Sequence, residues 1–160
     1  MSKSQALIVG GTTGMGKATA QLLLQQGIEV IIVGRADKNL EVVQKELSAF
    51  GSVKTVALNL FNTQAVKAFS EKIANDYPNL KYLVNSAGYF SPKLFLEHTE
   101  ADYDIYHNFN KAFFFITQSV AKVMVATGGG SIVNIGSMWA KQAIKATPSS
   151  AYSMAKAGLH

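Results

Sequence analysis

Five short runs of apolar, often β-branched residues alternate along this chain with longer stretches of helical character. The runs predict strands over Gln5–Val9, Glu29–Val33, Val53–Leu58, Tyr82–Asn85 and Ser131–Ile135. Strands that are apolar throughout and alternate with helices indicate a parallel sheet covered on both faces. Because crossovers between parallel strands are right-handed, the expected fold class is α/β, with a doubly wound, Rossmann-like parallel sheet.

Helices are expected between these strands. They cover Met15–Gln26, Lys38–Phe50, Thr63–Asp76 and a long stretch that ends near Ala126. The chain has 160 residues, enough to bury one core, and it contains no repeat, low-complexity tract or linker. We therefore expect a single domain over residues 1–160.

A glycine-rich turn joins the first predicted strand to the first predicted helix. Its sequence is Gly10-Gly11-Thr12-Thr13-Gly14-Met15-Gly16. Glycines let a backbone turn tightly and approach a pyrophosphate, which then lies at the positive end of the helix. A plain turn is the alternative, but this position after the first strand is typical of a dinucleotide-binding domain. The candidate cofactor contacts here are Gly10, Thr12, Thr13, Gly14, Met15 and Gly16.

The same turn differs by one residue from the phosphate-binding loop of nucleoside triphosphatases. Ala18 stands where that loop needs a hydroxyl group to hold Mg²⁺. The third predicted strand ends at Leu58-Asn59, without the metal-binding Asp of such enzymes. These two departures disfavour a triphosphatase.

Arg35 follows the second predicted strand, where an NAD-binding domain usually carries an acidic residue for the ribose 2′-hydroxyl. A guanidinium group suits a 2′-phosphate instead, by its charge and by its forked donors. The alternative is that Arg35 ends the strand and faces water. We expect NADP(H) to be preferred over NAD(H).

Tyr152 and Lys156 are four residues apart and therefore share one face of a helix. An ammonium group held beside a phenol favours the phenolate, and a phenol near its ionisation point can transfer protons at neutral pH. Such a spacing is common on exposed helices. It gains weight here because the same chain begins with the glycine-rich turn.

Composition excludes several other kinds of site. The chain has no cysteine, which rules out disulfides and thiolate chemistry. Its three histidines, His98, His107 and His160, lack the spacing of metal ligands, so no metal site is expected. The net charge of +5 is spread along the chain, which disfavours nucleic-acid binding. No apolar run reaches membrane-spanning length and no secretory signal is recognisable, so we expect a cytoplasmic protein without a membrane partner.

Four motifs in the same order resemble those of the short-chain dehydrogenases/reductases, over essentially all 160 residues. They are Gly10, Gly14 and Gly16, then Asn85-Ser86-Ala87-Gly88, then Ile135-Gly136-Ser137, and finally Tyr152 with Lys156. The resemblance implies an NADP(H)-dependent oxidoreductase that interconverts a ketone and a secondary alcohol. A small carbonyl compound or alcohol is then the expected partner. The alternative is a nucleotide-binding protein without turnover, or an inactive truncated remnant.

The resemblance also implies a role for each site residue. Tyr152 would be the general acid in reduction, and Lys156 would lower its pKa and hold the nicotinamide ribose. Ser137 would position the substrate oxygen, whereas a hydrolytic role for it is disfavoured because no G-x-S-x-G motif surrounds it. Further cofactor contacts would come from Asn59, Asn85, Ala87, Gly88, Tyr152 and Lys156.

The chain departs from the family pattern at several positions. Val9 stands where Thr is common, Asn59 where an Asp often lies, and Ser86 where a second Asn is usual. The family's helix Asn, which organises a water chain to the Lys, aligns with Phe109, between two asparagines. We assign the role to Asn110 rather than Asn108, on the assumption that the helix shortens locally by one residue.

Two expectations concern what surrounds the domain. Family members normally continue beyond the residues that end this chain, so the domain is expected to be truncated after the fifth strand and the start of the next helix, with that strand as an exposed sheet edge. The stretch Lys111–Val125 is apolar almost all round in its first half, which indicates either a homo-oligomer interface or a long core helix.

Overall fold

The computed structural model describes residues 3–142 and 145–160. Its strands and helices alternate as predicted, and two 3-10 turns, η1 and η2, flank the fourth helix and the fifth strand. In chain order the elements are β1 Gln5–Val9, α1 Gly14–Gln25, β2 Glu29–Gly34, α2 Lys38–Leu47, β3 Val53–Ala57, α3 Thr63–Asp76, β4 Leu80–Asn85, η1 Phe95–Glu97, α4 Glu100–Ala126, β5 Ser131–Asn134, η2 Met138–Ala140 and α5 Ser150–Leu159.

All five strands form one parallel sheet in the order β3-β2-β1-β4-β5. This is the strand order of a doubly wound sheet, in which the chain changes direction between β1 and β4. The predicted α/β, Rossmann-like fold is therefore confirmed.

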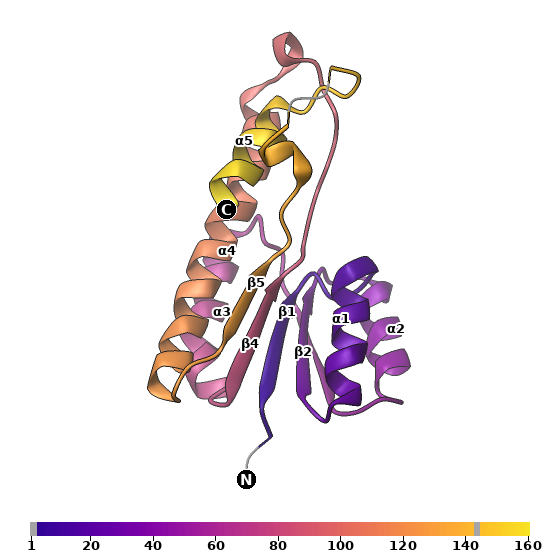
Figure 1. Cartoon of the computed structure of the whole chain (residues 1–160), viewed down its shortest axis with the longest axis vertical. Helices are drawn as coiled ribbons and strands as arrows, with labels where there is room; N and C mark the ends of the chain where they lie inside the picture. The colour runs from indigo at the N-terminus through magenta and orange to yellow at the C-terminus, as the bar shows by residue number, and fades with distance from the viewer. Residues whose placement is uncertain (1–2, 143–144) are drawn as a thin grey trace.

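Helices cover both faces of the sheet, with α1 and α2 on one face and α3 and α4 on the other (Figure 1). Residues of β1 alternate between the two layers: Ala6 and Ile8 pack with α1 and α2, whereas Leu7 and Val9 pack with α3 and α4. Because both faces are buried, every residue of β1 is buried, which explains its apolar run from Ala6 to Val9.

Most element boundaries follow local chemistry. Asp37 accepts a hydrogen bond from the Asn39 backbone at the start of α2, and Thr99 and Asp102 form a capping box at the start of α4. Two boundaries differ from the prediction by more than one residue. Helix α2 ends at Leu47 rather than Phe50, and β4 begins at Leu80, which is fully buried, rather than at Tyr82.

Strand β5 lies at one edge of the sheet, and all four of its residues are exposed. The expectation of an exposed fifth strand at the edge is thus confirmed. Beyond the carboxyl end of β5, helix α5 packs against α4 and η2 (Figure 1). Within the described part of the chain, no helix is both long and apolar enough to span a membrane.

Candidate active site

A cleft of about 480 Å³ opens at the carboxyl ends of β1, β2, β3 and β4. In open α/β sheets, ligands bind at this end, beside the point where the strand order reverses. Nine of the predicted cofactor residues line the cleft: Gly10, Thr12, Thr13, Gly14, Met15, Arg35, Asn59, Ala87 and Gly88.

The glycines of the first turn are required by close backbone approaches. Gly10 has a φ of 89°, and a Cβ atom at this position would lie 2.3 Å from the backbone nitrogen of Ala87. A Cβ atom at Gly16 would lie 2.3 Å from the carbonyl oxygen of Gly10. Gly16 therefore packs against the backbone of the turn and does not line the cleft. The absence of a side chain at Gly10 allows the turn after β1 to contact the segment after β4.

Helix α1 begins at Gly14, at the wall of the cleft. Among the described residues no side chain caps its N-terminus, and its first turn contains no acidic residue. The first backbone N–H groups and the positive end of the helix dipole therefore remain available for an anion. Together with the close-packed glycines, this chemistry fits the pyrophosphate of a dinucleotide.

Arg35 lines the rim of the cleft, and 80% of its side chain is exposed. Its Nε atom lies 3.9 Å from a carboxylate oxygen of Asp37, whose other oxygen caps helix α2. The guanidinium group thus lies beside one acidic residue but keeps most of its donors facing solvent. It is placed to meet a phosphate group at the rim.

Asn59 lines the cleft, and its Oδ1 atom accepts a hydrogen bond from the backbone of Phe61 at 3.1 Å. Asn85 is only 1% exposed and does not line the cleft. Its Nδ2 atom donates to Thr117 Oγ1 at 3.0 Å and to Asn134 Oδ1 at 2.8 Å. Its side chain therefore ties β4 to α4 and β5, and a cofactor contact of Asn85 stays a prediction.

Tyr152, Lys156 and Asn110 line a small cavity of about 20 Å³ next to the cleft. The two spaces share four lining residues, which are Ala87, Gly88, Tyr89 and Phe109. The predicted proton-transfer residues on α5 therefore lie beside the cofactor cleft, although they are far from the glycines in sequence.

Lys156 is half-buried and donates a hydrogen bond from Nζ to the carbonyl oxygen of Ile135 at 2.9 Å. The same Nζ atom lies 5.9 Å from the centre of the Tyr152 ring. Burial disfavours the charged form and lowers the pKa of Lys156 below its ordinary value. The Ile135 carbonyl fixes the ammonium group at the end of β5, next to the tyrosine.

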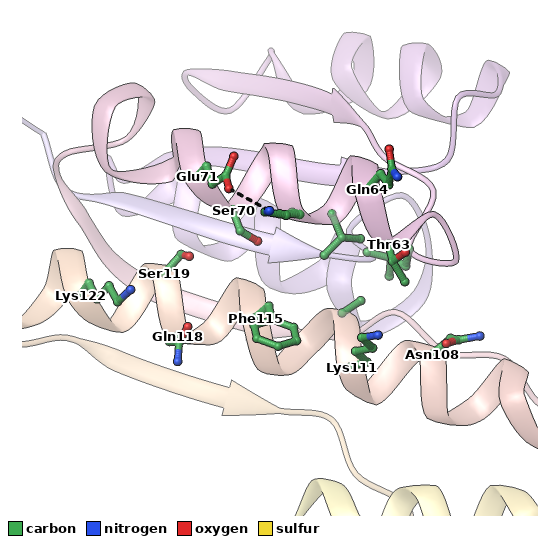
Figure 2. A pocket seen from close by; sticks show the side chains of 14 residues that line it. Thr63, Gln64, Ser70, Glu71, Asn108, Lys111, Phe115, Gln118, Ser119 and Lys122 are labelled. Carbon is green, nitrogen blue, oxygen red and sulfur yellow. Dashed lines mark ion pairs between the residues drawn. The ribbon is translucent and has the colours of Figure 1, made fainter.

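The two candidate asparagines of α4, Asn108 and Asn110, lie on different sides of the helix. Asn110 donates from Nδ2 to the carbonyl oxygen of Ala155 in α5 at 2.7 Å. Asn108 instead lines a groove of about 450 Å³ between α3 and α4, together with Phe115 and Lys111 (Figure 2). Helix α4 is continuous here, so Asn110 reaches α5 without the local shortening that we had assumed.

Ser137 lies directly before η2 and lines neither the cleft nor the small cavity in the described structure. Its Oγ atom accepts a hydrogen bond from the backbone N–H of Trp139 at 3.3 Å. The hydroxyl group of Ser137 can therefore still donate its hydrogen to another acceptor. Because η2 packs against α5, the serine is held on the same side of the molecule as Tyr152.

The sequence reasoning missed an aromatic cluster around Tyr152. Phe90, Trp139 and Tyr106 contact its ring, with ring centres 4.8, 5.8 and 5.7 Å away. A signal for it existed, because Phe90 follows the Asn85–Gly88 motif by two residues and Trp139 follows Ser137 by two.

The comparison with protein families agrees with this geometry. The family model for short chain dehydrogenases matches residues 4–160. The chain belongs to this family.

Among curated short-chain dehydrogenase relatives, the uncharacterized oxidoreductase YvrD of Bacillus subtilis is 34% identical over 99% of this chain and 60% of that protein. The 3-oxoacyl-(acyl-carrier-protein) reductase FabG of Thermotoga maritima is 36% identical over 82% of this chain and 54% of that protein. The chain thus spans little more than half the length of these relatives.

Solved structures of the short-chain dehydrogenase family superimpose closely. L-sorbose reductase from Gluconobacter frateurii, solved with NADPH and L-sorbose, has a TM-score of 0.88 at 26% identity, over 99% of this chain and 61% of that one. A metagenomic short-chain oxidoreductase in complex with NADP also has a TM-score of 0.88, at 28% identity over 99% of this chain and 72% of that one.

Proposed function

We propose that this short-chain dehydrogenase is an NADP(H)-dependent oxidoreductase that interconverts a ketone and a secondary alcohol. One observation carries the proposal: Tyr152 and Lys156 lie on α5 at a small cavity that shares its wall with the dinucleotide cleft. Two of its relatives are reductases of carbonyl compounds by name, FabG and L-sorbose reductase. The cleft and the small cavity beside it therefore support cofactor binding and proton transfer at adjoining places.

The cleft residues would hold the cofactor through its pyrophosphate and its 2′-phosphate. Backbone N–H groups at the start of α1, from Gly14 onward, would bind the pyrophosphate, and Arg35 would bind the 2′-phosphate. When bound, the nicotinamide would supply or accept the hydride. The chain itself must then supply or accept the accompanying proton.

Tyr152 would carry that proton, as acid in reduction and as base in oxidation. Lys156 supports this role because its ammonium group lies beside the ring and would stabilise the phenolate formed when the proton leaves. Its own contact with the Ile135 carbonyl keeps it in place throughout.

Ser137 would orient the substrate. Its oxygen already accepts from the Trp139 backbone, so its hydrogen can be donated to the carbonyl oxygen of the substrate. This bond would hold that oxygen for the proton from Tyr152. Asn110 donates to Ala155 and thereby fixes α5 against α4, which leaves its Oδ1 atom free to hold water on the path to Lys156.

Tyr152→Phe tests the proposal, because it removes the proton donor and keeps the ring. We expect NADPH-dependent reduction of a ketone to fall by about 10²- to 10⁴-fold, the usual contribution of general acid catalysis. The NADPH dissociation constant, measured by fluorescence titration, should stay nearly unchanged.

Tyr103→Phe is the matched control, since Tyr103 is an exposed tyrosine that stacks on His107, outside the aromatic contacts of Tyr152. It should keep full activity. If Tyr152→Phe retained most of the activity, the assignment would be wrong. NADPH binding by the native protein without oxidation by any carbonyl compound would favour a binding protein without turnover.

We also propose that two copies of the chain associate through α4. Its buried side packs on the sheet, while Phe114, Phe115 and Val125 remain exposed to solvent. An exposed apolar face on a helix whose other face is already buried suits a second copy of the same face.

A further inference from the structure

We propose that Phe90 and Trp139 form one wall of the substrate pocket and select carbonyl compounds that carry a flat apolar substituent, such as an aryl group. The inference rests on the proposed function, because it takes Tyr152 as the proton donor at the reacting carbonyl. It adds the class of substrate, which the family does not specify.

The two rings lie directly against Tyr152 and against each other. The ring centres of Phe90 and Tyr152 are 4.8 Å apart with an interplanar angle of 62°, and those of Trp139 and Tyr152 are 5.8 Å apart at 82°. Phe90 and Trp139 are 4.6 Å apart. These are the edge-to-face and tilted geometries that aromatic rings prefer, and a further ring can join such a cluster in the same way.

The cluster is assembled from three separate segments of the chain. Phe90 comes from the segment after β4, Trp139 from η2 and Tyr152 from α5. Its exposed edge is Phe90, which is 39% exposed. An apolar group of the substrate can therefore gain burial against Phe90 while its carbonyl group points to Tyr152.

The small cavity beside Tyr152 offers no further charged side chain, among the described residues, that could pair with a charged substituent. Among the described residues that line the small cavity, Lys156 is the one with a charged side chain, and its Nζ is bonded to Ile135. Two other cations, Lys141 and Lys145, line a separate cavity that also contacts Trp139 but not Phe90 or Tyr152. A preference for keto acids would point to that cavity instead.

The experiment compares kcat/KM for acetophenone, 2-butanone and pyruvate, with NADPH as the reductant. We expect the native protein to prefer acetophenone over 2-butanone by at least about tenfold, the discrimination that an apolar pocket gives for added apolar surface. Phe90→Ala should remove most of this ratio, because it lowers kcat/KM for acetophenone more than for 2-butanone. Phe95→Ala is the matched control, because Phe95 lies in the same connection but 75% exposed and outside the cluster.

Trp139→Phe separates the ring from its polar atom. The Trp139 Nε1 atom is buried and has no hydrogen-bond partner in the part of the chain that the structure describes. If the rings carry the selection, this variant should keep the acetophenone preference. An unchanged ratio in Phe90→Ala, or a native preference for pyruvate, would overturn the inference.

A binding measurement keeps the test independent of turnover. Trp139 is the single tryptophan of the chain, so its fluorescence reports on the cluster alone. With NADPH present, which cannot react with an alcohol, 1-phenylethanol should change this emission saturably in the native protein and at least about tenfold more weakly in Phe90→Ala, whereas 2-butanol should not. A saturable response without turnover would refute the proposed reaction but keep the aryl site; no saturable response would refute the aryl site.

Discussion

At the scale of single residues, three of the four predicted catalytic side chains are hydrogen-bonded to a backbone group. Lys156 is bonded to the Ile135 carbonyl, Asn110 to the Ala155 carbonyl, and Ser137 to the backbone N–H of Trp139. Catalytic groups fixed in this way need little reorganisation during the reaction.

Arg35 carries the prediction about the cofactor. Arg35→Ala removes the guanidinium group from the rim of the cleft, so NADPH should bind about tenfold or more weakly while NADH binding changes little, because only NADPH has the 2′-phosphate. Fluorescence titrations with both cofactors measure the change.

Lys45→Ala is the control for loss of one positive charge, since Lys45 is exposed in the last turn of α2. It should leave the ratio of the two dissociation constants unchanged. An equal ratio in Arg35→Ala and the native protein would show that Arg35 does not read the 2′-phosphate.

The site residues that could be predicted from sequence are those whose position along the chain fixes where they lie in the fold. Tyr152 and Lys156 share a helix face by their separation alone, and the turn glycines follow a strand directly. The hydrogen bonds of Asn85 could not be predicted because its partners, Thr117 and Asn134, are remote in sequence. The aromatic cluster around Tyr152 was missed for the same reason, since its residues come from separate segments of the chain.

At the scale of elements, α4 has two apolar faces, of which one is buried and the other is exposed to solvent. Its inner face, with Ile116 and Val120, is fully buried against the sheet. Its outer face keeps Phe114 at 64% exposure and Val125 at 82%. Sequence periodicity predicted the second apolar face, but the partner that covers it stays a prediction.

Phe114→Glu tests whether that face joins two copies. A carboxylate there would have to be buried in the interface, which is costly without a partner, so the variant should sediment as a monomer where the native protein forms dimers. Analytical ultracentrifugation over a range of concentrations measures the difference.

Leu22→Glu provides the matched control, because Leu22 is similarly exposed but lies on α1. It should leave the sedimentation unchanged. A native protein that remains monomeric at the highest concentrations would remove the proposed interface.

At the scale of the whole molecule, the fold brings the ends of β1 and β4 together. The chain reverses its direction of winding there, and Gly10 after β1 lies against Ala87 after β4. The cleft and the small cavity both border this point. Strand order thus explains why motifs separated by more than half of the chain form one site.

The sheet could be predicted from sequence because the central strands β1 and β2 are almost entirely apolar and helices separate the strands. The boundaries of α2 and β4 could not, since they depend on a turn after Leu47 and on burial of Leu80. The single dinucleotide-binding domain and the cytoplasmic location remain predictions.

A crystal structure with NADP⁺ tests the central claim most directly. The account predicts the pyrophosphate at the backbone of Gly14 and Met15, the 2′-phosphate at Arg35, and the nicotinamide ring beside the Tyr152 hydroxyl, with space for one carbonyl oxygen between them. A nicotinamide ring that lies away from α5, or a pyrophosphate bound elsewhere, would contradict it.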